Sequence, residues 1–559
     1  MLEARNAAAD RRANPGPARL ARRRGISCLA PALAVAPAVA AGPRAAANPL
    51  VTDNPAAGPG AVTLLVYDGV AQPFSLMDVR AVLARLLTRA NTRVVTKSVE
   101  EVRPDDVRSA SYLVWLGTGR SPSPVRLGWT AVDKPVLICG MPPLEAGAWA
   151  GVNGLRKFPP KPESFASARI TLGRAVIPTP VSYAISAKAE GEDARTFAEI
   201  ATPSGTQTLA WQSGNVFWFP ALPLEQGVGV ALSGILPYFY GFTPSDSGLL
   251  VTLDDFHLGC DLASLKRAAD YLAQKDIPFA VSIRVPGAEE DVARVHEFVS
   301  TVRYAQARKG RIFVPPAPGD GFWNQEFDRP PTAEAIEAAG QGAAADVGRC
   351  IENGVLPLGI RLPDSGVGIE AAARMARMFD FGIGAVLPLE ATCTATFIPA
   401  TVTRVAGRLL LAPPGTAAGE ASGRREDYER NLLLVPGTVV NVSIPAWQPF
   451  DQMMPELDRV MALGAGFLDP GDAAVAISTP VGALWNARAG ATKPDFSGRA
   501  ILRTYDARAQ QLSEKEISAD SAAVVESPPD AQFFSLTPWK PQGPYLLWVP
   551  SRRPPSPQP

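Results

Sequence analysis

Two adjacent acids, Asp254 and Asp255, directly follow an apolar run, and a histidine, His257, comes two residues later. Carboxylates at the end of a buried strand are costly to desolvate unless a cation or a metal ion pairs with them. We therefore interpret this motif as the start of a candidate site.

Two more acids, Asp320 and Asp364, follow later predicted strands. Together with Asp255 and His257 they would form an oxygen-rich ligand set, which suits Mg²⁺, Ca²⁺ or Mn²⁺ better than Zn²⁺. The alternative for His257 is a loop histidine that is hydrogen-bonded to a neighbouring acid.

Aromatic residues also lie just past the predicted strand ends, namely Phe256, Trp323 and Trp447. Aromatic side chains with acids and amides beside them are a common way to hold a sugar ring. The alternative is an ordinary loop whose aromatic side chains pack beneath it. We predict Phe256, Trp323 and Trp447 as substrate-binding residues.

The elements that precede this motif predict two different modules. Strands and one helix alternate over residues 61–160, which favours a small parallel sheet of flavodoxin-like shape. Short β-prone runs separated by glycine, serine and proline fill residues 161–245, which indicates a β-rich connector. The predicted elements of the first module are strands at Val62–Tyr67, Thr92–Thr96, Ser111–Leu116 and Val136–Cys139 and a helix at Leu76–Ala90.

Strand–helix alternation restarts at Leu249, and the number of strands over residues 246–478 predicts a (β/α) barrel. Functional residues of such barrels lie at the carboxyl ends of the strands, where the candidate site falls. Asp261 is expected to cap the helix after the first barrel strand. Residues 394–411 are expected to form an inserted hairpin, residues 479–551 a β-rich appendage and residues 552–559 a disordered tail.

The N-terminus has the features of an export signal. Seven arginines precede an apolar stretch from Ile26 to Ala41, and Ala38-Val39-Ala40 fits a cleavage site. We predict a signal peptide over residues 1–41, a linker over 42–60, and a periplasmic or extracellular protein; the alternative is a disordered leader. No later segment predicts a membrane span, because the best candidate, Gly227–Phe242, is short and interrupted by glycine and proline.

Charge and cysteine usage exclude other classes of protein. The 54 basic and 54 acidic residues balance, so no basic excess points to a nucleic-acid partner. The five cysteines contain no C-x-x-C pair, and we expect buried free thiols rather than a metal or redox motif. Cys139 follows an apolar strand, but the two histidines, His257 and His296, both lie in the barrel. We therefore expect Cys139 to be structural.

The run LLVTLDDFHLGCDLASLKRAADYLAQKDIPFAVSI, residues 249–283, resembles the opening of polysaccharide-deacetylase-like (β/α) barrels. It is more similar to a branch of that family found in exported bacterial proteins with an N-terminal amidotransferase-like domain. SYLVWLGTG and KPVLICG resemble that N-terminal domain, and WQSGNVFWFPALPL resembles its β connector. With the segment that begins YERNLLLVPG, the resemblance extends over residues 61–475 in the same order.

The resemblance implies Asp254 as the general base and Asp255 as a ligand of a divalent metal, usually zinc. The family mechanism also needs three histidines, and they are not matched. At three places where the family has histidines, this chain has other residues. Proline-rich sequence follows Arg311–Val314, Asp364 follows Pro363, and the late strand segment ends at Trp447. Because the whole chain has two histidines, the three imidazoles of that mechanism cannot be assembled.

We therefore predict a cell-envelope protein whose degenerate barrel binds polysaccharide or acts as a scaffold, without a cofactor. One alternative is a metal-dependent carbohydrate deacetylase or hydrolase with a remodelled carboxylate site formed by Asp255, His257, Asp320 and Asp364. Its metal would be Zn²⁺, Mg²⁺, Mn²⁺ or Ca²⁺. A second alternative is a purely structural or protein-binding role. The sequence indicates neither a protein partner nor an oligomeric state.

Overall fold

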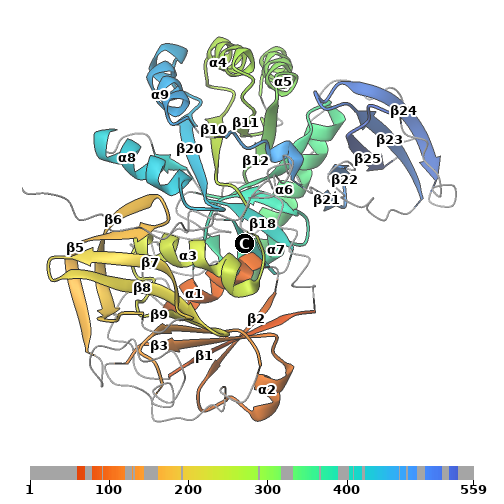
Figure 1. The fold of residues 1–559 in the computed structure, drawn as a ribbon. Helices are drawn as coiled ribbons and strands as arrows, with labels where there is room; N and C mark the ends of the chain where they lie inside the picture. The colour runs from red at the N-terminus through yellow and green to blue at the C-terminus, as the bar shows by residue number, and fades with distance from the viewer. Residues whose placement is uncertain are drawn as a thin grey trace, which may run out of the picture. The chain divides into compact units, whose positions relative to one another are not determined.

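The structure is a computed structural model, and Figure 1 shows its sheets and helices. The chain divides into two compact units, Met1–Ala45 and Ala46–Pro559, and every described residue belongs to the second. The predicted signal peptide, nearly all of the linker, and the tail lie outside the described residues. The structure describes residues 60–68, 79–90, 92–119, 129, 133–143, 161–189, 193–243, 245–287, 290–316, 332–363, 367–387, 402–406, 408–413, 415–417, 422–464, 466–473, 476–486, 498–518 and 528–538.

Among the described residues, the first sheet has nine strands in the order β2-β1-β3-β4-β9-β8-β7-β5-β6. Its first five strands are parallel, and α1 and α2 follow β1 and β2 along the chain. β3 and β4 are buried throughout, as expected for apolar strands covered on both faces. The bounds are β1 Val62–Tyr67, α1 Val79–Leu87, β2 Arg93–Ser98, α2 Pro104–Ser109, β3 Tyr112–Gly117, β4 Val136–Gly140 and β9 Val216–Phe219.

Antiparallel strands extend this same sheet beyond β9. β9 pairs in parallel with β4 and antiparallel with β8, so it joins the two halves. The strands predicted as a separate connector therefore continue the α/β sheet, because β4 leaves an edge that β9 completes. The helix that follows, α3, is buried along nearly its whole length. The bounds are β5 Pro162–Leu172, β6 Ala175–Ile185, β7 Arg195–Thr202, β8 Gly205–Ser213 and α3 Gln226–Tyr240.

The second sheet has the order β17-β18-β15-β13-β12-β11-β10-β20-β19, and every neighbouring pair except β17–β18 is parallel. Strands and helices alternate along the chain, as the sequence predicts. The strand bounds are β10 Gly248–Phe256, β11 Phe279–Ile283, β12 Gly310–Val314, β13 Pro357–Arg361, β15 Phe381–Ile383, β17 Thr403–Val405, β18 Leu409–Ala412, β19 Thr416–Ala417 and β20 Val439–Pro445.

Helices α4, α5 and α9 lie beside β10, β11 and β20 (Figure 1). Asp261 caps α4, as predicted, by accepting a hydrogen bond from the Ala263 N–H at 3.1 Å. A short two-stranded sheet of β14 and β16 accompanies α7. The bounds are α4 Leu262–Gln274, α5 Val292–Gln306, α6 Ala333–Glu352, β14 Val367–Gly368, α7 Ile369–Met375, β16 Val386–Leu387, α8 Ser422–Leu433 and α9 Phe450–Ala462.

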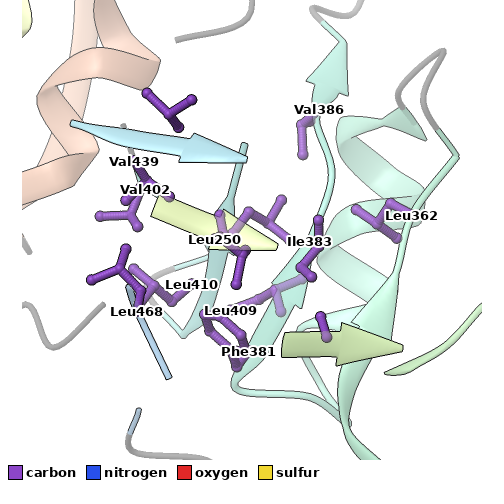
Figure 2. Close-up of a cluster of buried hydrophobic side chains, with 14 of the residues drawn as sticks. Leu250, Leu362, Phe381, Ile383, Val386, Val402, Leu409, Leu410, Val439 and Leu468 are labelled. Carbon is purple, nitrogen blue, oxygen red and sulfur yellow. The ribbon is translucent and has the colours of Figure 1, made fainter. Parts of the chain in front are cut away.

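The second sheet curls, and its interior is packed with apolar side chains. Figure 2 shows Leu250 of β10, Ile383 of β15 and Leu409 of β18 converging in one cluster. Strands three apart in a flat sheet would be separated by about 14 Å, yet side chains of β10 and β13 are hydrogen-bonded. The described strands therefore form a curled half-barrel, which has the curvature expected of the predicted barrel.

The predicted inserted hairpin is partly a strand of the second sheet itself. β17 and β18 pair antiparallel, but β18 also pairs in parallel with β15. The apolar run Leu409–Leu411 is buried there, so its burial depends on β15 rather than on the hairpin alone. Residues 394–401, the beginning of that predicted hairpin, lie outside the described part of the chain.

A third, antiparallel sheet of order β21-β22-β25-β23-β24 accounts for the predicted β-rich appendage. Arg311 of β12 contacts it: its Nη1 donates to the Ala507 carbonyl at 3.0 Å, while Nε and Nη2 hold Asp469. No described helix is long and apolar enough to cross a membrane. The bounds are β21 Ala476–Thr479, β22 Gly482–Asn486, β23 Arg499–Tyr505, β24 Gln511–Ser518 and β25 Phe533–Pro538.

Candidate functional site

The paired acids lie on a β-bulge at the carboxyl end of β10. Leu253 is opposite Val281 of β11, but Phe256 is opposite Ile283, so β10 carries one extra residue. A bulge of this kind redirects side chains and is frequent beside functional sites. The side chains of Asp254 and Asp255 lie in two different environments at this bulge.

Asp254 is largely covered by a polar cluster drawn from several strands. The Arg361 guanidinium at the end of β13 holds both carboxylate oxygens, with Nε at 3.2 and 3.1 Å and Nη2 at 2.5 Å from Oδ2. The Ser443 hydroxyl of β20 donates to Oδ2 at 3.1 Å. The side chains of Arg361 and Asp254 are only 5% and 15% exposed, so this pair is an interior one.

The cluster keeps Asp254 ionised. Burial raises the pKa of this carboxyl, but the Arg361 charge and hydrogen bonds from Arg361, Ser282 and Ser443 together lower it below its ordinary value. A general base works best when its pKa lies near the working pH. Asp254 is therefore a weak base in this arrangement. Its charged carboxylate instead holds the neighbouring side chains in place.

Asp255 occupies a more open position and a strained backbone. Its φ is +61°, a left-handed conformation that is uncommon for a residue other than glycine. The carboxylate is held by Arg284, with Nε 2.5 Å from Oδ1 and Nη2 2.9 Å from Oδ2. The Arg284 side chain is 62% exposed and that of Asp255 36%. Strain of this kind is concentrated at functional sites.

His257 and Cys260 complete the turn after β10. The Gly259 N–H donates to His257 Nδ1 at 3.0 Å, so the predicted alternative, a histidine in a loop, fits, although its partner is a backbone amide rather than an acid. The His257 N–H donates to the Cys260 sulfur at 3.3 Å. Burial raises the pKa of the Cys260 thiol, which opposes formation of a nucleophilic thiolate.

The described residues do not assemble the predicted metal site. Both Asp255 oxygens contact a guanidinium, and His257 Nδ1 is already an acceptor. Across the described ranges no three His, Cys, Asp or Glu side chains are arranged to hold a metal ion. The other predicted ligands, Asp320 and Asp364, lie outside those ranges, so the complete set stays a prediction.

The three predicted aromatic residues have different positions. Phe256 is fully buried and stacks on Phe298 at 5.1 Å between ring centroids, so it belongs to the core rather than to a binding surface. Trp447 is 53% exposed in the turn after β20. The N–H of the preceding Ala446 donates to the Asp254 carbonyl at 2.6 Å, which holds this turn against the site. Trp323 lies outside the described residues.

We define the rim site as Asp254, Asp255, Arg284, Arg361 and Trp447. The two arginines and Ser443 were missed in the sequence analysis. A signal was present, because Arg284 and Arg361 end the apolar runs of β11 and β13, just as the acids end β10. Charged residues at the ends of neighbouring parallel strands meet at the same edge of a sheet.

Cys139 and His296, which the sequence analysis also considered, have no contact with the rim site among the described interactions. Cys139 is fully buried in β4 and carries a free thiol whose pKa is raised by burial. His296 is exposed on α5. The burial of Cys139 agrees with the structural role expected for it.

Comparison with known proteins gives no family for this chain. A scan against protein-family models found no match, and a search of curated proteins found none either.

Proposed function

We propose that the rim site binds carbohydrate, as part of a polysaccharide-associated protein of the cell envelope. The observation that carries this proposal is Trp447, a large aromatic side chain 53% exposed beside the charged pairs at the sheet edge. A ligand site typically combines an aromatic or apolar surface with a few fixed polar groups. A sugar ring has both an apolar face and hydroxyl groups that match this combination.

The polar partners in the rim site favour binding over catalysis. Asp254 is bonded to Arg361 and Ser443, and its lowered pKa makes it a poor proton acceptor. Such a fixed, buried pair costs little further ordering when a ligand arrives, because its rotamers are already set. It can orient neighbouring groups without itself changing protonation.

Equilibrium binding to acetylated and deacetylated oligosaccharides tests the proposal. We expect Trp447→Ala to weaken binding about tenfold, equivalent to about 1.4 kcal/mol. The matched control is Leu512→Ala, which removes a 41% exposed apolar side chain from β24 of the third sheet. Flat isotherms for the wild-type protein across the whole panel, or equal losses in both variants, would contradict carbohydrate binding at the rim site.

The second candidate function is a metal-dependent carbohydrate deacetylase or hydrolase. The left-handed backbone of Asp255 at φ +61° supports it, since strained backbone conformations cluster at functional sites. This function needs Asp320 or Asp364 beside Asp255. Metal content of the purified protein and acetate release from acetylated glycans test it, and Asp255→Ala should abolish both. A wild-type protein with neither property would exclude this candidate.

A further inference from the structure

We propose that Arg284 makes the rim site selective for acidic glycans, that is, for sugars that carry a carboxylate. The inference rests on the proposed carbohydrate binding and adds the class of sugar. Arg284 directly follows β11, and its N–H donates to the Phe256 carbonyl at 2.8 Å. Its backbone is therefore anchored to β10, while its side chain extends into solvent.

The Arg284 guanidinium has a second, unused edge. The pair with Asp255 uses Nε and Nη2. A guanidinium has five N–H donors in a planar fork, so both donors of Nη1 and the second donor of Nη2 remain. In the described part of the chain no acceptor contacts this edge, and its spacing matches the two oxygens of a carboxylate.

Arg361, the other arginine of the rim site, cannot play this role. Its Nε and Nη2 hold Asp254, and its Nη1 donates to the Leu362 carbonyl at 2.6 Å. Its side chain is 5% exposed. A ligand that drew Arg361 away would leave the buried Asp254 carboxylate without its counter-charge. Arg284, at 62% exposed, can add a partner without losing Asp255.

Trp447 and Arg284 follow strands that lie close enough for one ligand to reach both residues. These strands, β20 and β11, flank β10 on either side. Their separation is two strand spacings, or about 10 Å. A sugar ring on Trp447 could therefore belong to the same short oligosaccharide as a carboxylate on Arg284. The acids of the rim site, Asp254 and Asp255, each have one guanidinium partner, so neither faces the ligand as an uncompensated charge.

The test compares an oligouronate with the same oligosaccharide after reduction of its carboxyl groups to primary alcohols. We expect the acidic form to bind the wild-type protein at least tenfold more tightly, with an affinity that falls between 50 and 200 mM salt. Arg284→Gln should bring the acidic form down to the affinity of the reduced one. Arg284→Lys keeps the charge but not the fork, and should recover only part of the difference.

Two further variants complete the design. Asp255→Asn removes the negative charge beside Arg284 and should strengthen binding of the acidic form. Arg267→Gln is the matched control. Arg267 on α4 is 57% exposed, close to the 62% of Arg284, and it is likewise paired with an acid, Asp451. Thermal unfolding of each variant verifies that it is folded before its affinity is compared.

The outcomes separate this inference from the function on which it rests. If both forms bind equally and Trp447→Ala weakens both, carbohydrate binding stands and selectivity for acidic glycans is refuted. A preference that survives Arg284→Gln, or that Arg267→Gln removes equally, also refutes it. If neither form binds and no other glycan does, the proposed function itself fails.

Discussion

Two neighbouring aspartates have opposite environments in this protein. Asp254 is 15% exposed and enclosed by Arg361 and Ser443, whereas Asp255 is 36% exposed and held by a solvent-facing Arg284. The bulge in β10 and the left-handed backbone of Asp255 place the two adjacent carboxylates in these environments. One carboxylate therefore stabilises the rim site, and the other stays accessible to a ligand.

The first prediction concerns the buried pair. Arg361→Ala leaves the Asp254 carboxylate without its partner, so we expect a loss of about 3–5 kcal/mol in the free energy of unfolding at pH 7. The folded-state pKa of Asp254 is lowered. The stability that it contributes is therefore present above the unfolded-state pKa of about 3.9 and is lost as the pH falls through the folded-state pKa.

Urea unfolding followed by circular dichroism between pH 3 and pH 7 measures both effects. The wild-type protein should lose stability below about pH 4, and Asp254→Asn should flatten that part of the profile. In Arg361→Ala the defect should shrink on acidification, because protonation removes the uncompensated charge. An Arg361→Ala variant as stable as the wild-type protein at pH 7 would contradict the role assigned to this pair.

At the scale of elements, α8 and α9 are joined by a buried charge network. Glu429 of α8 is 1% exposed and pairs with Arg425 on its own helix and with Arg459 on α9. Glu456 of α9 contacts the same two arginines. Four charges of alternating sign thus connect the two helices. Such a network depends on every member, since each buried charge needs its partners.

The second prediction tests this network. Glu429→Gln should lower the free energy of unfolding by about 3 kcal/mol, because Arg425 and Arg459 lose the more deeply buried of the two carboxylates that they share. Glu426→Gln is the control one turn earlier: its partner Arg430 is 50% exposed, and we expect a loss of at most about 0.5 kcal/mol. Chemical unfolding of both variants gives the comparison. Equal, small losses would mean that solvent reaches Glu429.

At the scale of the whole molecule, buried free cysteines are distributed over separate parts of the fold. Cys139 lies in β4 of the first sheet, Cys260 beside the rim site, and Cys350 in α6. Burial raises the pKa of all three thiols. A thiol that is both covered and protonated reacts slowly, so these residues report on unfolding of the regions that contain them.

The third prediction follows from this distribution. In a Cys28→Ser/Cys393→Ser variant, a thiol reagent such as DTNB should find no rapidly reacting group in the native protein and three groups after unfolding in urea. Burial of the sulfur atoms is the physical reason. Rapid modification of any one thiol under native conditions would show that the region around it opens.

Much of the fold was predictable because its signals are local. Apolar runs between turn residues predicted β1 and β4 nearly residue for residue, and Asp261 was correctly predicted as a helix cap. Pairing between strands was less predictable. That β9 would join two expected modules, and that β18 would pair with β15, depended on which edges were free in the folded chain.

The sequence alone determined the elements, the position of Asp254 and Asp255 at a strand end, and the shortage of histidines. Only the tertiary structure decided what those acids contact. Arg284 is 29 residues from Asp255, and Arg361 is 107 residues from Asp254. Periodicity and capping depend on neighbours along the chain, whereas the partner of a charge depends on strand order and on the curl of the sheet. This is why the arginines of the rim site emerged only in the folded molecule.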